Sequence, residues 1–443
     1  MPHTTDANRF EPRTYAKVDR RLLPFLFGCY VLAYLDRVDV GFAKLQMLKD
    51  LGWSEEAFGV GAGVFFIGYF LFEVPSNLLL RRFGARRWIA RIMVTWGLVC
   101  LSMIWVEGAW GFYVRRFLLG FAEAGFFPGI IYYLTLWYPS RLRAGRTALF
   151  VAAIPAAGLL GNPLSGLIMD SLSGVAGWRG WQWLFLCDGL PSVVAGVVVW
   201  FYLDNGVAEA AWLSAEEKSL IEANLAAEDA GKERARLGDA LQCGQVYVLS
   251  AVYFTLMVGL YGISFWLPTI VKGFGVTGYR DTGLITAIPY AVAVAGMIVL
   301  SRYSDRTGER RRPYIWNVTA GACGLALSAV FAAHPVPAIL CLSVGTLGVI
   351  GSMPLFWPMP SAILRGTAAA AGIGLVNSVG NLGGYLGPNI PVWLGRASVG
   401  PAVAMGAISG ILLAGAVLAA LFIPGSGVVG ASTPEDPTPR RRG

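Results

Sequence analysis

The chain consists largely of long apolar runs joined by short polar connections. A helix needs about 20 apolar residues to cross a bilayer, and runs of that length recur along the chain. They predict twelve membrane-spanning helices, at residues 22–45, 57–80, 88–106, 110–134, 147–171, 181–203, 246–270, 282–302, 313–333, 336–359, 369–393 and 399–423. We therefore expect an all-α membrane protein.

One long polar interval, residues 204–243, separates the first six predicted spans from the last six. Within it, Ser214 stands three residues before Glu217, the spacing of a capping box that begins a helix. The C-terminal segment is rich in Pro, Gly and Arg, a composition typical of disorder. We predict an N-terminal six-helix bundle (1–203), a cytoplasmic central loop (204–243), a C-terminal six-helix bundle (244–424) and a disordered tail (425–443).

The composition agrees with a membrane protein and leaves little material for catalysis. Of all residues, 56% are hydrophobic and 14% are charged, a charged fraction well below that of soluble domains. His3 and His334 are the two histidines, so histidine-based catalysis or metal binding is not expected. The six cysteines show no CxxC spacing, and five lie in predicted spans. We expect no enzymatic activity, no metal and no cofactor.

The net charge of +8 raises the question of nucleic-acid binding. If both termini are cytoplasmic, 26 of the 35 Lys and Arg residues lie on the inner side of the membrane and six on the outer side. This distribution follows the positive-inside rule. The basic residues therefore predict membrane orientation, with cytoplasmic termini, and no nucleic-acid partner. We expect a multi-pass, monomeric protein of the inner (plasma) membrane that is surrounded by the lipid bilayer.

Two predicted cytoplasmic connections have similar sequences, "NLLLRRFGARR" at 77–87 and "SRYSDRTGERR" at 301–311. Their glycines, Gly84 and Gly308, are 224 residues apart, about half the chain. Parallel repeats of six spans with a binding site between them are one way to build an alternating-access carrier, although two basic loops can also acquire a turn glycine by chance. We assign a gating role to Arg82, Gly84, Arg86, Asp305, Arg306, Gly308 and Arg310.

At these loops the chain resembles the major facilitator superfamily. The second loop matches the loop motif of that family through Asp305, Arg306, Gly308 and Arg310, whereas in the first loop Arg81 stands where the motif has an acid. The segments "YLDRVDVGFAKLQM", "GYFLFEVPSNLLL", "RFLLGFAEAGFFPG", "YGISFWLP" and "GLVNSVGNLGGYLGP" are similar to the anion:cation symporter family, in its bacterial branch of phthalate, tartrate and sugar-acid permeases. The resemblance implies two pseudo-symmetric six-helix bundles.

Three charged residues, Asp36, Arg37 and Asp39, lie near the middle of the first predicted span. One charge at a helix centre costs about 2.5–3.5 kcal/mol on insertion scales, so three within four residues indicate a function. Asp36 and Asp39 share a helix face. Arg37 points about 100° away from Asp36, so it can face a cavity while an acid packs toward a neighbouring helix.

The fourth predicted span carries a second set of charges. Glu123 lies near its middle, and Arg116 is two turns away on the same face. Burial and a neighbouring carboxylate both favour the protonated acid, and the planar fork of arginine suits a substrate carboxylate. We assign Asp36 and Glu123 to proton coupling, and Arg37 and Arg116 to substrate binding.

The resemblance implies the same roles at Asp36, Arg37 and Glu123, whereas Asp39 stays unassigned. The alternative is that Asp36–Arg37 and Glu123–Arg116 are ion pairs that fasten helices together. We expect the arginine and the carboxyl groups to face one watery chamber at mid-membrane, between the two bundles. At the offset of 224 residues, the equivalents of Asp36 and Glu123 are near Leu260 and Leu347, so the buried charge is concentrated in the first half.

Several uncharged side chains in other spans can contribute hydrogen bonds or a ring face to a substrate. The candidates for substrate binding are Tyr34, Tyr69, Tyr261, Trp357 and Asn377. Glu73 lies toward the inner end of the second span, where we expect it to form part of a cytoplasmic gate with nearby arginines.

These assignments predict proton-coupled uptake of a small organic anion, a mono- or dicarboxylate such as tartrate, phthalate, hydroxyphenylacetate or a sugar acid. The inward-negative potential opposes anion entry by about 2.3 kcal/mol per charge per 100 mV, and co-transported protons remove that penalty. The alternative is an antiporter or drug exporter of the same fold. It predicts a broad apolar pocket and an intact antiporter motif in the fifth span, which "GLLGNPLSG" with Asn162 only partly resembles.

Overall fold

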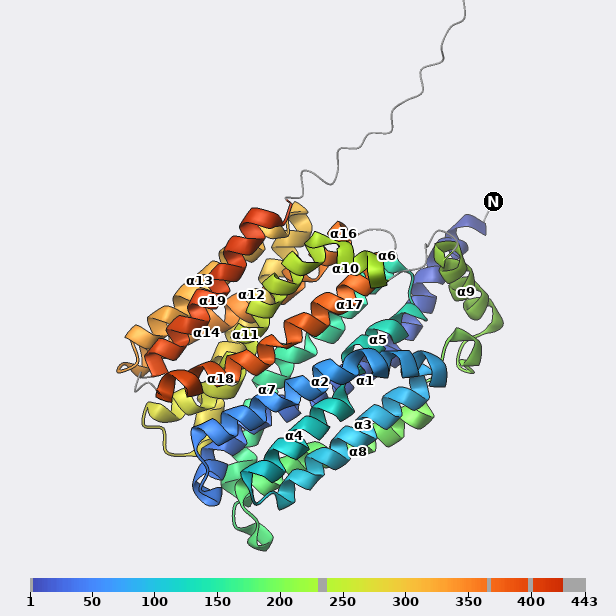
Figure 1. Cartoon of the computed structure of the whole chain (residues 1–443). Coiled ribbons are helices and arrows are strands. Elements are labelled where there is room, and N and C mark those ends of the chain that lie inside the picture. The colour runs from blue at the N-terminus through green and yellow to red at the C-terminus, as the bar shows by residue number, and fades with distance from the viewer. Residues whose placement is uncertain (1–2, 230–236, 365–367, 397–400, 425–443) are drawn as a thin grey trace, which may run out of the picture.

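The computed structural model describes residues 3–229, 237–364, 368–396 and 401–424. Within these ranges the chain is helical and contains no β-strand. Figure 1 shows long helices that run side by side, with the N-terminal half (blue to green) beside the C-terminal half (yellow to red). The predicted disordered tail and the basic residues Lys232, Arg234, Arg236 and Arg365 lie outside the described residues.

The first half of the chain forms eight α-helices, α1–α8, which we call the N half. Their bounds are α1 (His3–Leu51), α2 (Glu55–Phe83), α3 (Ala85–Ser102), α4 (Ala109–Glu123), α5 (Phe126–Thr135), α6 (Ser140–Val151), α7 (Ala153–Leu172) and α8 (Gly180–Tyr202), with 3-10 turns η1 (Met103–Trp105) and η2 (Val175–Gly177).

The second half forms α11–α19, which we call the C half. Its helices are α11 (Gly244–Gly273), α12 (Tyr279–Thr307), α13 (Arg311–Val330), α14 (Pro335–Ile350), α15 (Met353–Phe356), α16 (Pro358–Ile363), α17 (Ala368–Asn381), α18 (Gly383–Arg396) and α19 (Pro401–Phe422). The interval between the halves contains η3 (Val207–Glu209), α9 (Ala215–Asp229) and α10 (Leu237–Gln242).

Each of the twelve predicted spans falls on one helix or on consecutive helices. In the described part of the chain, nine helical stretches are long and apolar enough to cross a membrane. The predicted spans at 22–45, 313–333 and 369–393 are not among them, so a crossing at those three stays a prediction. The first of them lies in α1, whose apolar run is interrupted by Asp36, Arg37 and Asp39.

The capping box predicted from the sequence begins α9. The backbone N–H of Ser214 donates to Glu217 Oε2 at 2.8 Å, and the N–H of Glu217 donates to Ser214 Oγ at 3.2 Å. Lys17 of α1 forms an ion pair with Glu217 at 2.7 Å, which fixes α9 against the first helix. The short surface helix expected from the pattern is therefore confirmed.

The fourth predicted span is broken into α4 and α5 directly after Glu123. Gly125 has φ +87°, a left-handed conformation that favours glycine. A Cβ at this position would also lie 2.3 Å from Ser76 Oγ of α2. The glycine therefore allows the break, which places Glu123 at the C-terminal end of α4.

The N half and the C half pack together through α1 with α11, α2 with α18, and α7 with α12. At the last of these contacts the backbones approach closely, since a Cβ on Gly166 would lie 2.4 Å from the carbonyl oxygen of Tyr279. Near the same place, Asp170 at the end of α7 accepts backbone hydrogen bonds from Tyr279 and Arg280, at 3.1 and 2.6 Å. These contacts enclose a central space between the halves.

Candidate functional site

A small cavity lies between the halves and is lined by side chains from both. The N half contributes Tyr30, Tyr34, Arg37, Tyr69, Phe127, Val151 and Ile154, and the C half contributes Tyr253, Met257, Tyr261, Met353, Trp357, Asn377 and Asn381. The free space is about 20 Å³, close to what one water molecule needs. An organic acid is larger, so its entry requires the walls to move apart.

Arg37 of α1 is the charged member of this lining. Its Nη1 donates to Tyr261 Oη of α11 at 2.5 Å, and its Nη2 donates to the Glu123 carboxylate as an ion pair. The rings of Tyr34 and Tyr69 lie 5.0 and 5.5 Å from the guanidinium carbon, within the range of a cation–π interaction. The guanidinium is thus fixed at the cavity wall by both halves.

Glu123 lies behind Arg37 rather than in the cavity wall. Its side chain is buried, and Oε1 pairs with Arg37 while Oε2 has no hydrogen-bond partner among the described residues. A buried carboxylate with one free oxygen depends on its single arginine for stabilisation. Any group that competes for Arg37 therefore changes the tendency of Glu123 to take up a proton.

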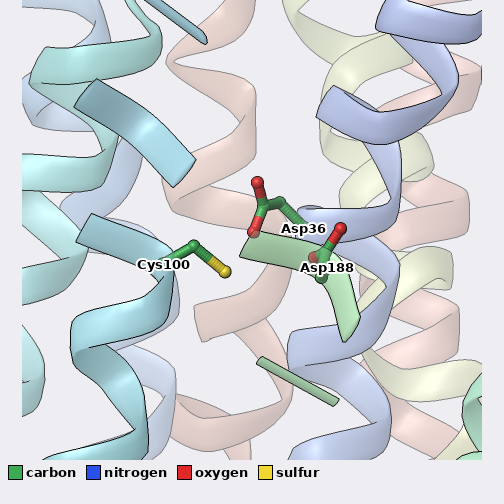
Figure 2. Close-up of side chains that lie close together, drawn as sticks. All are labelled: Asp36, Cys100 and Asp188. Carbon is green, nitrogen blue, oxygen red and sulfur yellow. The ribbon is translucent and has the colours of Figure 1, made fainter. Parts of the chain in front are cut away.

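Asp36 points away from the cavity, into the interior of the N half. Figure 2 shows its carboxyl group close to Asp188 of α8 and to Cys100 of α3. Ligand atoms of the three residues lie within 4.8 Å of one another. The expectation of one chamber shared by all the charged groups is therefore wrong for Asp36, and also for Glu123, because neither lines the cavity. For Asp36 the reason is the helix geometry, because neighbouring residues on α1 point about 100° apart.

Arg116 also lies outside the cavity lining, which corrects the expectation that it faces the substrate chamber. Its side chain is 0% exposed between α4 and α2. Its Nε donates to the Gly61 carbonyl at 3.4 Å, and Nη1 and Nη2 have no hydrogen-bond partner in the described part of the chain. Arg116 and Glu123 share a face but are about 10 Å apart along the axis, and no ion pair between them occurs among the described residues.

Glu73 joins the two halves on the side of the cavity nearer the loop at 77–87. Its carboxylate accepts hydrogen bonds from Asn377 Nδ2 at 2.6 Å and from Ser378 Oγ at 2.9 Å. Both partners lie on α17, whereas the sequence suggested arginines. The arginines that follow are two turns further along α2, too far to reach Glu73.

Sequence reasoning missed two buried charged residues, Asp188 and Lys44. Asp188 is an acid within the apolar span 181–203, a signal that would have drawn attention to it. Lys44 had been counted only as a basic residue of the outer side. Its side chain is buried, with Nζ 3.3 Å from the centre of the Trp266 ring and 3.3 Å from the Glu55 carboxylate.

Asp39, which lies outside the cavity lining, and several of the aromatic lining residues have defined partners. Asp39 accepts a hydrogen bond from Ser165 of α7. The hydroxyl oxygens of Tyr34 and Tyr261 lie 3.5 Å apart, and Trp357 packs against the ring of Tyr253 at 5.0 Å between ring centres. The cavity therefore has an aromatic wall that includes the hydroxyl groups of Tyr34 and Tyr261.

The two loops proposed as gates differ in their contacts. In the second loop, Asp305 and Arg310 form an ion pair at 2.5 Å, and Gly308 ends α12 with φ +67°. In the first loop, Gly84 has φ +87° and the backbone N–H of Arg86 donates to Asn205 at 3.2 Å. The side chains of Arg82 and Arg306 are exposed. The first loop is thus held by a hydrogen bond to the Asn205 side chain, which follows α8, whereas the second is held by an ion pair within the loop.

Comparison with known proteins identifies similar chains. The family model described as "Major Facilitator Superfamily" matches residues 26–388. The chain is 45% identical over 419 residues to a "Putative tartrate transporter" of Agrobacterium vitis, which covers 93% of this chain and 91% of that protein. It is 42% identical over 382 residues to a "Quinolone resistance transporter" of Acinetobacter baumannii, which covers 86% of this chain and 88% of that protein.

The fold also matches a solved structure. The xylose transporter XylE from E. coli, in a partially occluded inward open conformation, superposes with a TM-score of 0.72 at 16% identity. The match covers 92% of this chain and 98% of that chain.

Proposed function

Because the chain belongs to the major facilitator superfamily, it is a multi-pass membrane transporter of a small organic substrate and not an enzyme, and we propose that it carries an organic anion inward together with protons. The observation that carries this proposal is the placement of Arg37. Its guanidinium lines the cavity. Glu123 of the N half pairs with it from outside the cavity, and Tyr261 of the C half accepts a hydrogen bond from it.

The pairing of Arg37 with Glu123 suggests how substrate and proton are coupled. A substrate carboxylate binds the planar guanidinium best through two parallel hydrogen bonds, and Glu123 already uses one of the two Nη groups. Protonation of Glu123 removes its negative charge and frees Arg37 for the substrate. The substrate in turn takes the counter-ion from Glu123, which favours the neutral acid. Each ligand therefore promotes binding of the other.

Movement of the two halves against each other then exposes the site to either side of the membrane. We propose that Asp170 and Lys44, which contact Tyr279, Arg280 and Trp266 of the C half, close the outer side. Glu73, with Asn377 and Ser378, closes the inner side. The halves act as the two bundles predicted at 1–203 and 244–424, in a monomer of the inner membrane with cytoplasmic termini.

A small carboxylate fits the chemistry of the cavity. Arg37 supplies the charge, Tyr34, Tyr69 and Tyr261 supply hydroxyl groups, and Asn377 supplies an amide. Several hydroxyl and amide groups around one arginine suit a hydroxylated acid such as tartrate or a sugar acid. The relative named a putative tartrate transporter supports this substrate class.

The test is uptake by purified protein in proteoliposomes. With an inward proton gradient and radiolabelled tartrate, we expect accumulation above the external concentration, and its collapse when a protonophore is added. An uncharged sugar serves as the control substrate. Uptake that ignores the gradient, for every acid in a panel of tartrate, phthalate, hydroxyphenylacetate and sugar acids, would contradict proton-coupled uptake.

Drug or anion efflux is the second candidate, and the relative named a quinolone resistance transporter favours it. An exporter would move substrate out against the same gradient. Everted and right-side-out vesicles compared in one assay distinguish the two directions. The charged residue in the cavity wall supports the anion carrier, because a broad apolar pocket would have no use for Arg37.

A further inference from the structure

Asp36, which we assigned to proton coupling from the sequence, lies beside a second acid, Asp188, and the scheme of Arg37 and Glu123 above uses neither member of this pair. Asp188 comes from the middle of α8 and Asp36 from α1, and Figure 2 shows the two side chains near each other, with Cys100 of α3 beside them. The ligand atoms of all three lie within 4.8 Å of one another. Their exposed fractions are 2% for each aspartate and 0% for the cysteine.

The polar atoms of this pair have little compensation. Asp36 Oδ2 and both carboxyl oxygens of Asp188 have no hydrogen-bond partner among the described residues. An isolated buried carboxylate without hydrogen bonds costs several kcal/mol, and two carboxylates whose oxygens lie within 4.8 Å repel each other in addition. The two groups cannot both be ionised at moderate cost.

The charged groups around the pair favour one negative charge. Arg116 of α4 is near enough to attract Asp36, and its Nη1 and Nη2 atoms are unpartnered in the described part of the chain. Asp39 of α1 and Glu123 of α4 are near enough to repel Asp188, but they interact with Ser165 and Arg37 respectively. Arg37 also attracts Asp36, but it is paired with Glu123. With Arg116 beside two acids, the charge is balanced when one acid is ionised and the other holds a proton.

We propose that Asp36 and Asp188 share one proton and form a second proton-binding site of the carrier, separate from Glu123 and outside the substrate cavity. A proton needs no free volume, because it sits in a hydrogen bond between the two carboxyl groups. A metal ion fits less well, since the site offers three ligand atoms and faces the positive charge of Arg116. This inference rests on the proposed proton-coupled function.

The position of the pair explains how it can take part in transport. Asp36 and Arg37 are consecutive residues on one turn of α1, so any shift of that turn when substrate binds Arg37 also changes the distance between Asp36 and Asp188. Separation of the two carboxyl groups weakens the shared hydrogen bond and releases the proton. The carrier then moves one proton at Glu123 and a second at the pair in each cycle.

The first measurement does not depend on transport. Infrared difference spectroscopy on the purified protein detects the C=O stretch of a protonated carboxylic acid. We expect such a band at neutral pH in the wild type, and its loss or shift in Asp188→Asn and in Asp36→Asn. Cys100→Ser, which changes the same cluster without removing an acid, keeps the band. A wild-type band unaffected by either aspartate variant would overturn the shared proton.

The second measurement is the number of protons carried per tartrate, obtained in proteoliposomes from the membrane potential that balances a set substrate and pH gradient. Asp188→Asn lowers this number by one and lowers accumulation about tenfold for a gradient of one pH unit. Asp188→Glu and Cys100→Ser keep the wild-type number. If Asp188→Asn does not fold, Asp188→Glu takes its place in the test. This variant keeps a titrating acid, so it should carry the wild-type number of protons per tartrate. A lower number would count against a titrating group at this position.

The outcomes separate the two proposals. Wild-type uptake that is not driven by protons refutes the proposed function whatever the infrared band shows. Proton-driven wild-type uptake with an unchanged number of protons in Asp188→Asn refutes the second site alone. If the purified protein contains one equivalent of a metal that is lost in Asp188→Asn, the site binds a metal cation and the shared proton is refuted.

Discussion

The two halves of the molecule repeat a helical arrangement but differ sharply in what they bury. In the N half the buried side chains include eight charged ones, Asp36, Arg37, Asp39, Lys44, Glu73, Arg116, Glu123 and Asp188. In the described C half, the polar side chains that are buried are Ser, Thr and Asn. The halves therefore share a scaffold while the ionisable chemistry belongs to one of them.

The hydrogen bond between Arg37 and Tyr261 joins a charged residue of the N half to a neutral residue of the C half. The two residues are 224 positions apart, the same offset that separates Gly84 and Gly308 of the repeated loops. Arg37 thus meets the equivalent residue of the other repeat across the cavity. On one side of the pseudo-symmetry axis the position holds a fixed positive charge, and on the other a neutral hydroxyl group that orients it. The C half contributes uncharged side chains to the cavity lining, and the N half contributes the charged one.

The largest effect is expected from Glu123→Gln. The amide keeps the shape of Glu123 but can neither release a proton nor form an ion pair, so gradient-driven accumulation of the anion is lost. Exchange of labelled for unlabelled substrate, which needs no net proton movement, persists. Both are measured in proteoliposomes, with Glu107→Gln on an exposed loop of the same half as the matched control. Normal accumulation by Glu123→Gln would show that the carboxyl group of Glu123 does not carry the coupled proton.

The next effect is expected from Arg37→Lys, which conserves charge but removes the planar fork. Loss of a charge-assisted hydrogen bond costs about 1.5–3 kcal/mol, so KM for the anion should rise about 10- to 100-fold. Arg115→Lys, in the same half but away from the cavity lining, should leave KM unchanged. An unaltered KM in Arg37→Lys would argue against direct recognition of a carboxylate.

The contrast between the halves also shows how far the sequence could be read. Apolar run length predicted the helices, and the Ser214 and Glu217 spacing predicted α9. The step of about 100° allowed Arg37 to line the cavity without Asp36, as the lining shows, although we had expected the carboxyl groups to face the same chamber. Periodicity gives the direction of a side chain but not the helix that it meets.

For that reason the partners of Glu73 on α17, which are 304 and 305 residues away, could not be predicted from the sequence. The position of Arg116 outside the cavity lining depends in the same way on how α4 packs against α2. Asp188 gives the same signal as Glu73, a single acid in an apolar span, but its closeness to Asp36 depends on how α8 packs against α1.

A smaller effect is expected on the other side of the same contact, from Tyr261→Phe. The ring stays in place and only the hydroxyl group that accepts from Arg37 is lost. A neutral partner of this kind contributes about 0.5–1.5 kcal/mol, so KM should rise about 2- to 10-fold with proton stoichiometry unchanged. Transport kinetics at several pH values measure both quantities. A change in proton number would mean that the C half takes part in coupling, and the division between the halves would be wrong.

The smallest effect is expected at the loops, where the charge asymmetry is reversed. The C-half loop has the ion pair of Asp305 and Arg310, while Arg81 occupies the equivalent place of an acid in the N-half loop. Asp305 is 64% exposed in its side chain, and exposed pairs contribute at most about 1 kcal/mol. Asp305→Asn should therefore slow uptake by no more than about fivefold, and raised ionic strength should reduce the difference because salt screens exposed charges.

Arg81→Ala is the matched change in the other loop, and it should leave the uptake rate unchanged because no acid faces Arg81 in the loop itself. Initial rates of both variants at two salt concentrations provide the test. Equal losses from the two variants would mean that the loops work alike. A loss confined to Asp305→Asn assigns the electrostatic part of gating to the C half, which buries no charged side chain among its described residues. The carrier would then place its proton chemistry inside one half and its charged loop contact on the surface of the other.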